Sequence, residues 1–232
     1  RRPIPAPGGR RLVSADGLAA ALGRRDFSPR ILASMNLEIV SDHPLRGRSL
    51  LCEDAKGSIG HCEVPPSGIH STLPPTGAPR EADLCIWLIE KGHLSIEQTS
   101  GFQARFGAGS VLLCDLAQPL RGQWERSRFA YIRPARPRLL EVLGHPPGPR
   151  QRAVETLEHL GLAPFLASQL EMLSMHGAAL TPPDLETVLG GIFRTAETLL
   201  KSVFATGPES SAGPSADRLQ GVRWHIPRNL HR

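Results

Sequence analysis

The β character of the chain is clearest in residues 83–115, which read DLCIWLIEKGHLSIEQTSGFQARFGAGSVLLCD. Short apolar runs alternate here with turn residues at Lys91-Gly92, Ser100-Gly101 and Gly107-Ala108-Gly109. This pattern predicts strands joined by tight turns, with hairpins at the first two of these steps. Residues 84–89 (LCIWLI) are apolar at every position. We therefore expect this strand to be covered on both faces, one lining a lumen and the other packed against another element.

Strand-like segments continue on both sides of this stretch. We expect strands at residues 36–40, 49–54, 58–64, 83–90, 93–98, 102–106, 110–115 and 127–133. The segments are short and no helical pattern separates them, which favours an antiparallel sandwich or barrel over a βαβ sheet. The proline-rich residues 65–79 are expected to form a loop between strands.

From about residue 150 the apolar residues recur at helical spacing instead. We expect helices over 150–160, 164–176 and 182–205, and the last begins with a capping pattern at Thr181-Pro182-Pro183-Asp184. The apolar stripe of helix 182–205 has two interpretations: core within the chain, or a seam shared with a second subunit. The second interpretation predicts a homodimer whose interface includes Leu185, Leu189, Ile192, Ala196 and Leu199.

The two ends of the chain differ from this central part. Residues 1–34 are expected to be a Pro-, Gly- and Arg-rich leader with a short helix at 14–23, and residues 206–216 have the composition of a linker. In the basic segment 217–232, Arg218 and Arg223 are candidates for weak DNA contacts through phosphate. The formal charge of +5 comes mostly from scattered arginines, so charge alone does not predict a nucleic-acid-binding protein.

Two further patterns limit where the protein acts. No apolar run reaches the roughly 18 to 20 residues of a membrane span, so no membrane association is expected. The four cysteines contain no CxxC pair, which fits a reducing cytoplasm better than a disulfide framework or a zinc ribbon.

The sequence holds few residues that could carry catalysis. A metal-binding cupin needs two histidines one residue apart, a carboxylate and a later histidine, whereas the histidines here stand singly. His61 and Glu63 share a strand face and could supply two ligands at most. No nucleophile elbow or phosphate-binding loop occurs, so we expect no metal, no cofactor and no catalytic residue. His61 and Glu63, near a barrel mouth, and Trp87 are instead candidate ligand-binding residues, with core packing as the alternative for Trp87.

The order of segments between residues 83 and 144 resembles the ligand-binding domain of AraC/XylS-type transcriptional regulators. The resemblance is carried by the turn at Lys91-Gly92, the hairpin at Gly101, residues 111–119 (VLLCDLAQP) and residues 137–140 (PRLL). Members of the family usually have Pro-Gly-Asp where this chain has Ala108-Gly109-Ser110, but Asp115 and Pro119 fit the pattern. Similar matches follow at residues 160–165 (LGLAPF), in helix 182–205, and at residues 217–226 (DRLQGVRWHI), which look like the first helix of the family's DNA-binding domain.

The resemblance implies a mainly β plus α fold: a cupin-like effector-binding barrel over 35–145 and a helical dimerisation segment over 150–205. Residues 217–232 would then begin a helix-turn-helix domain that is otherwise missing. The implied function is the effector-sensing and dimerisation part of a bacterial, cytoplasmic AraC-type regulator. Its partners would be a second copy, a small-molecule effector and, through the missing domain, DNA. Two alternatives stay open: a metal-dependent cupin oxygenase or isomerase, and a stand-alone dimerising modulator of full-length regulators.

Overall fold

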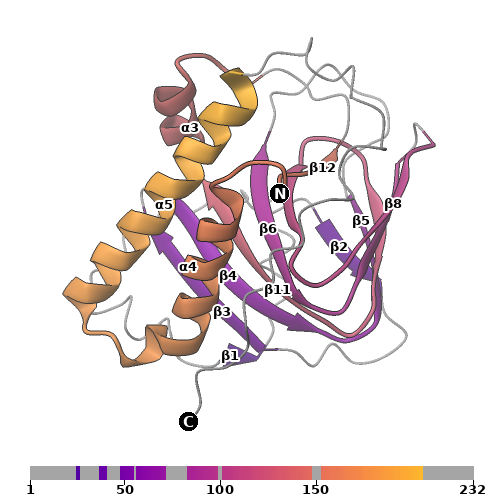
Figure 1. Ribbon diagram of the computed structural model, residues 1–232. Coiled ribbons are helices and arrows are strands. Elements are labelled where there is room, and N and C mark those ends of the chain that lie inside the picture. The colour runs from indigo at the N-terminus through magenta and orange to yellow at the C-terminus, as the bar shows by residue number, and fades with distance from the viewer. Residues whose placement is uncertain are drawn as a thin grey trace, which may run out of the picture.

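The computed structural model describes residues 25–26, 37–40, 48–54, 56–71, 83–98, 101–147 and 153–205. The described strands form two antiparallel sheets, and the helices lie against one of them (Figure 1). The predicted helix at 14–23, the linker at 206–216, and Arg218 and Arg223 all fall outside the described residues.

The larger sheet has seven strands in the order β1-β3-β4-β11-β6-β9-β12. Its three central strands, β4, β11 and β6, are also its longest, with eight residues each. The bounds are β1 (Arg25–Asp26), β3 (Arg48–Asp54), β4 (Gly57–Val64), β11 (Ser127–Pro134), β6 (Leu84–Lys91), β9 (Val111–Asp115) and β12 (Val154–Thr156).

The smaller sheet has five strands in the order β2-β5-β10-β7-β8. Their bounds are β2 (Leu37–Val40), β5 (Ser67–Ser71), β10 (Arg121–Trp124), β7 (Leu94–Glu97) and β8 (Gln103–Phe106). The chain changes sheets from β6 to β7, from β8 to β9, from β9 to β10 and from β10 to β11. This is the connectivity of a double-sheet jelly roll, the architecture of cupin domains. The predicted antiparallel, cupin-like β plus α fold is therefore confirmed, although the two sheets are not closed into one barrel.

The prediction of a hairpin at Lys91-Gly92 is wrong. Strand β6 pairs with β11 and β9, whereas β7 pairs with β10 and β8, so the turn carries the chain from one sheet to the other. Gly92 has a φ of +80°, and a side chain there would collide with the backbone of Arg126. The second predicted hairpin, around Gly101, is present, because β7 and β8 pair from Leu94↔Phe106 to Glu97↔Gln103.

Four strands are missing from the sequence prediction. Strand β1 lies within the predicted leader, β5 within the predicted loop 65–79, and β12 within the predicted helix 150–160. Strand β10 (RGQW) has a single apolar residue other than glycine and so shows no alternation.

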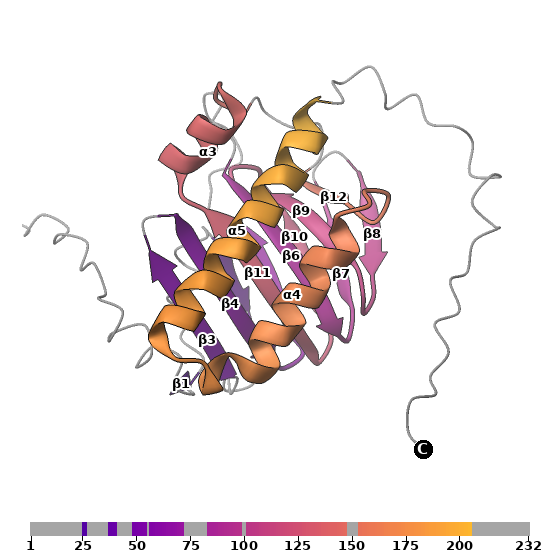
Figure 2. The same ribbon diagram turned by 60° about the vertical axis from the view of Figure 1, so that its left-hand side comes forward.

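The apolar strand β6 is covered on both faces, as predicted. Its Cys85, Trp87 and Ile89 belong to the core between the two sheets. The alternate residues Leu84, Ile86 and Leu88 belong to a second core, which packs against helices. These helices are α4 (Ala163–His176) and α5 (Pro182–Ala205), which cross the outer face of the seven-stranded sheet (Figure 2).

The apolar stripe of α5 forms this second core. The side chains proposed as a dimer seam are at most 4% exposed and pack within the chain: Leu185, Leu189, Ile192, Ala196 and Leu199. The structure therefore corrects their assignment from subunit contacts to intrachain core, which was the other interpretation of the stripe. Whether the chain dimerises stays a prediction, and a dimer contact needs other residues.

Shorter elements complete the helical layer. Helix α3 (Arg136–Leu143) is held to α5 by Arg138, whose Nε and a terminal nitrogen donate to the two carboxylate oxygens of Glu197 at 2.7 and 2.9 Å. The 3₁₀ helix η1 (Gly177–Ala179) links α4 to α5. None of the helices in the described ranges is long and apolar enough to cross a lipid bilayer.

Candidate functional site

The interior between the sheets contains Trp87, which is 1% exposed. Its ring centroid lies 5.8 Å from that of Trp124 and 6.0 Å from that of Phe129, and the latter two rings stack at 4.5 Å. These rings fill the space that a lumen would need at this level of the sandwich. Trp87 therefore has the core role that was the alternative to ligand stacking.

His61 and Glu63 lie on the opposite face of the seven-stranded sheet from Trp87. On β4, Cys62 and Val64 face the sandwich interior, so His61 and Glu63 share the outer face, as predicted. Glu63 is exposed, and its cross-strand partner on β11 is Arg128. The three predicted ligand-binding residues therefore do not line one pocket.

His61 contacts a buried carboxylate that the sequence analysis missed. The Oε2 atom of Glu90 lies 2.8 Å from Nε2 of His61 and 2.6 Å from Nε of Arg128. The Glu90 side chain is only 5% exposed, whereas those of His61 and Arg128 are 17% and 37% exposed. We call these three residues the Glu90 cluster. A carboxylate this deeply buried is tolerated because a cationic group neutralises it.

The Glu90 cluster occurs at a β-bulge. In the pairing of β11 with β6, Arg128 faces Lys91 while the next residue, Phe129, faces Ile89, so Glu90 lies opposite the irregularity. Bulges redirect side chains and are frequent beside functional sites. Here the Oε1 atom of Glu90 is buried without a hydrogen-bond partner among the described residues. Such an unsatisfied oxygen is unusual, and it marks the cluster as the candidate functional site of the outer face.

The cluster borders the helical layer. A cavity of about 10 Å³ separates the His61 side of the sheet from α4, and it is lined by Ile59, Gly60, His61, Ala130, Leu170, Leu173 and Ser174. A space of this size holds at most one water molecule. The Glu90 cluster is therefore a charged contact among three strands of the sheet, with His61 beside this small space, and it is not a pocket for a small-molecule ligand.

Metal binding and thiol chemistry are two other possibilities that the described residues can be checked for. These residues contain no group of three or more His, Cys, Asp or Glu side chains close enough to hold a metal ion, so they offer no ligand set for a metal-dependent cupin enzyme. Cys62, Cys85 and Cys114 are free thiols in the sandwich core. Burial raises the pKa of Cys62 to about 12 and also raises the pKa values of the other two. These thiols stay protonated and unreactive at neutral pH.

The stability of the Glu90 cluster gives the first prediction. Glu90→Ala should lower the free energy of unfolding by about 2 kcal/mol, because it removes the carboxylate that both Arg128 and His61 contact. Urea denaturation followed by circular dichroism measures this change. The matched control is Glu63→Ala on the same face, where the exposed side chain should contribute less than about 0.5 kcal/mol. Equal effects of the two substitutions would contradict the structural role of the cluster.

Comparisons with known proteins give no match to any family model and none to any curated protein. Solved structures do match. The crystal structure of the AraC-like transcriptional activator CuxR is similar, with a TM-score of 0.53 and 14% sequence identity, over 79% of this chain and 70% of that one. The cupin domain of Cnp3 from Schizosaccharomyces pombe gives a TM-score of 0.30 and 17% identity over 49% of this chain and 78% of that one. A protein with a double-stranded β-helix domain from Klebsiella pneumoniae gives a TM-score of 0.29 and 11% identity over 50% of this chain and 86% of that one.

The similarity to CuxR is one of fold. It covers 79% of this chain and 70% of that one, and at 14% identity it concerns the fold alone. Over most of its length, this chain is therefore similar in fold to an AraC-like activator.

Proposed function

We propose that the chain is the effector-sensing and dimerisation part of an AraC-type transcriptional regulator that acts in the cytoplasm. The observation that carries the proposal is the similarity in fold to CuxR over 79% of the chain. The order of turns and motifs between residues 83 and 144 supports it independently, because that resemblance rests on the amino-acid sequence and not on the fold.

The packing of the sheet against α5 could transmit a conformational change from the strands to the helices. The outer face of β6 and the apolar stripe of α5 belong to one continuous core, so a shift of the sheet would disturb the packing of α5. The Glu90 cluster lies on the same face, at the bulge where β6 and β11 change register. In the proposed regulator, effector binding to the strands would move the helices through these contacts.

The proposed homodimer needs a surface other than the buried stripe of α5. Helix α4 has one: Phe165, Met172 and Met175 are 66%, 53% and 59% exposed. Their spacing of seven and ten residues places them on one side of the helix. We therefore propose that α4 supplies the apolar contacts of the dimer.

A chimera tests this function. Residues 1–216 are joined to the DNA-binding domain of a characterised AraC-type regulator, and a reporter with two half-sites measures occupancy in cells. We expect occupancy at least about tenfold above that of the isolated DNA-binding domain, because dimerisation links two half-site interactions. Met172→Glu should reduce occupancy to the level of the isolated domain.

The matched control is Thr198→Glu, which adds the same charge at an exposed position of α5. It should leave occupancy unchanged. A chimera no more active than the DNA-binding domain alone would reject the proposed function. A chimera equally active with and without Met172→Glu would reject the α4 interface.

A further inference from the structure

The face of the five-stranded sheet that points away from the larger sheet is hollowed. A groove of about 490 Å³ runs over β7, β8 and β10. The groove is shallow and open to solvent, and every polar side chain that lines it is exposed. We call it the outer groove and define it by its polar side chains: Ser95, Glu97, Gln103, Arg105, Arg121 and Gln123.

The strand register arranges these side chains in two rows across the sheet. Arg121 lies opposite Glu97, which lies opposite Gln103. In the next outward-facing row, Gln123 lies opposite Ser95, which lies opposite Arg105. The alternate residues, such as Ile96 and Trp124, point into the core. Directly opposed side chains are about 5 Å apart at their Cβ atoms, so a small molecule can contact both rows at once.

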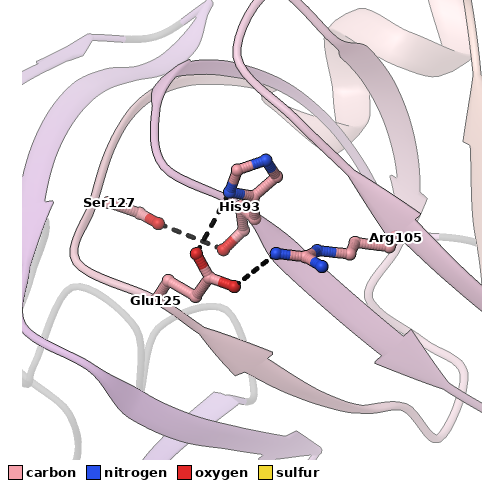
Figure 3. A network of polar contacts seen from close by, with 4 residues as sticks. All are labelled: His93, Arg105, Glu125 and Ser127. Carbon is pink, nitrogen blue, oxygen red and sulfur yellow. Dashed lines mark hydrogen bonds and ion pairs between the residues drawn. The ribbon is translucent and has the colours of Figure 1, made fainter.

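One of the two arginines is held in position at the rim (Figure 3). A terminal nitrogen of Arg105 donates to Oε1 of Glu125 at 2.6 Å, and Oε2 of Glu125 lies 3.1 Å from Nδ1 of His93. Ser127 supports the same corner, because its hydroxyl donates to the main-chain carbonyl of His93 at 3.1 Å. Arg105 is 60% exposed, so its remaining N–H groups are accessible from solvent.

The other arginine has no fixed partner. The side chain of Arg121 is exposed, and its guanidinium makes no hydrogen bond or ion pair with a residue in the described ranges, although Glu97 is its cross-strand neighbour. Guanidinium groups bind carboxylates through two parallel hydrogen bonds, and such pairs are among the stronger polar contacts in proteins. Arg121 is therefore the group in the outer groove best suited to bind an anion.

We propose that the outer groove binds a small carboxylate that also carries hydroxyl groups, such as a sugar acid. Arg121 would bind the carboxylate. The amide of Gln123 and the hydroxyl of Ser95 offer donors and acceptors side by side, as a series of hydroxyl groups requires. The amide nitrogen of Gln103 donates to Oε1 of Glu97 at 3.4 Å, which leaves its amide oxygen as a further acceptor. Only the role of this molecule as an effector rests on the proposed function; the binding itself does not.

The test uses the full chain and two matched probes, D-glucuronate and D-glucose, which share their ring hydroxyls but differ in the carboxylate. Ligand-observed NMR titration to roughly 10 mM should give saturable binding of glucuronate and much weaker binding of glucose. Arg121→Gln should weaken glucuronate binding about tenfold or more. Glu125→Gln, which releases Arg105, should weaken it about threefold. Arg126→Gln removes the same charge from an exposed turn beside β10 and should have no effect.

Three results would overturn the proposal: no saturable binding of glucuronate, equal binding of glucose, or binding unaffected by Arg121→Gln in a variant whose thermal unfolding is unchanged. None of them bears on the chimera, which measures dimer-dependent occupancy of DNA without ligand. A negative result for ligand binding in the outer groove can thus be distinguished from a negative result for the proposed regulatory function.

Discussion

Leu189→Glu combined with Leu199→Glu is expected to leave no folded protein. Both side chains are buried between α5 and the outer face of the seven-stranded sheet, at 4% and 0% exposure. Two carboxylates placed there would have no cationic partner, and each would cost several kcal/mol. Their sum is comparable to the whole stability of a domain, about 5–15 kcal/mol. Loss of soluble protein and of the circular dichroism signal would be the observed result.

A matched pair of substitutions separates burial from charge. Val188→Glu with Thr198→Glu adds the same two charges to the same helix at exposed positions, where Val188 is 36% exposed. This variant should fold. If the Leu189 and Leu199 variant were instead soluble, folded and monomeric by light scattering, the stripe would be a subunit seam and the intrachain core described above would be wrong.

The stripe of α5 illustrates what periodicity can and cannot predict. A repeat of three and four residues establishes an amphipathic helix, and the structure has it at Pro182–Ala205 as expected. The repeat carries no information on what covers the apolar face, because a sheet and a second subunit demand the same residues. The apolar run of β6 had the same limit: coverage of both faces could be predicted, but not that helices provide it on one side.

The candidate site depended on pairings that no local pattern encodes. Alternation on β4 placed His61 and Glu63 on one face correctly, but the actual partner of His61 is Glu90, which is 29 residues away. That contact forms where β6 and β11 shift register at Arg128 and Phe129, and a bulge has no signature in a single sequence. The outer groove was missed for a related reason. Its rows exist only once β7, β8 and β10 are in register, and β10 itself was not predicted.

The second large effect is expected for Trp87→Ala. It removes the ring that packs against both Trp124 and Phe129 in the interior, and such truncations cost about 3–5 kcal/mol because a cavity remains. Urea denaturation measures the loss of stability. Faster labelling of the buried thiols should accompany it, since Cys85 and Cys114 lie in the same core.

Trp87→Phe is the informative control for that variant. Phenylalanine keeps an aromatic ring against Trp124 and Phe129 and loses only part of the contact area of the indole. Because most of the space stays filled, the expected cost is about 1 kcal/mol. A similarly small cost for Trp87→Ala would mean that Trp87 borders an open lumen. The aromatic core would then not be closed, and the effector site would have to be sought inside the sandwich rather than in the outer groove.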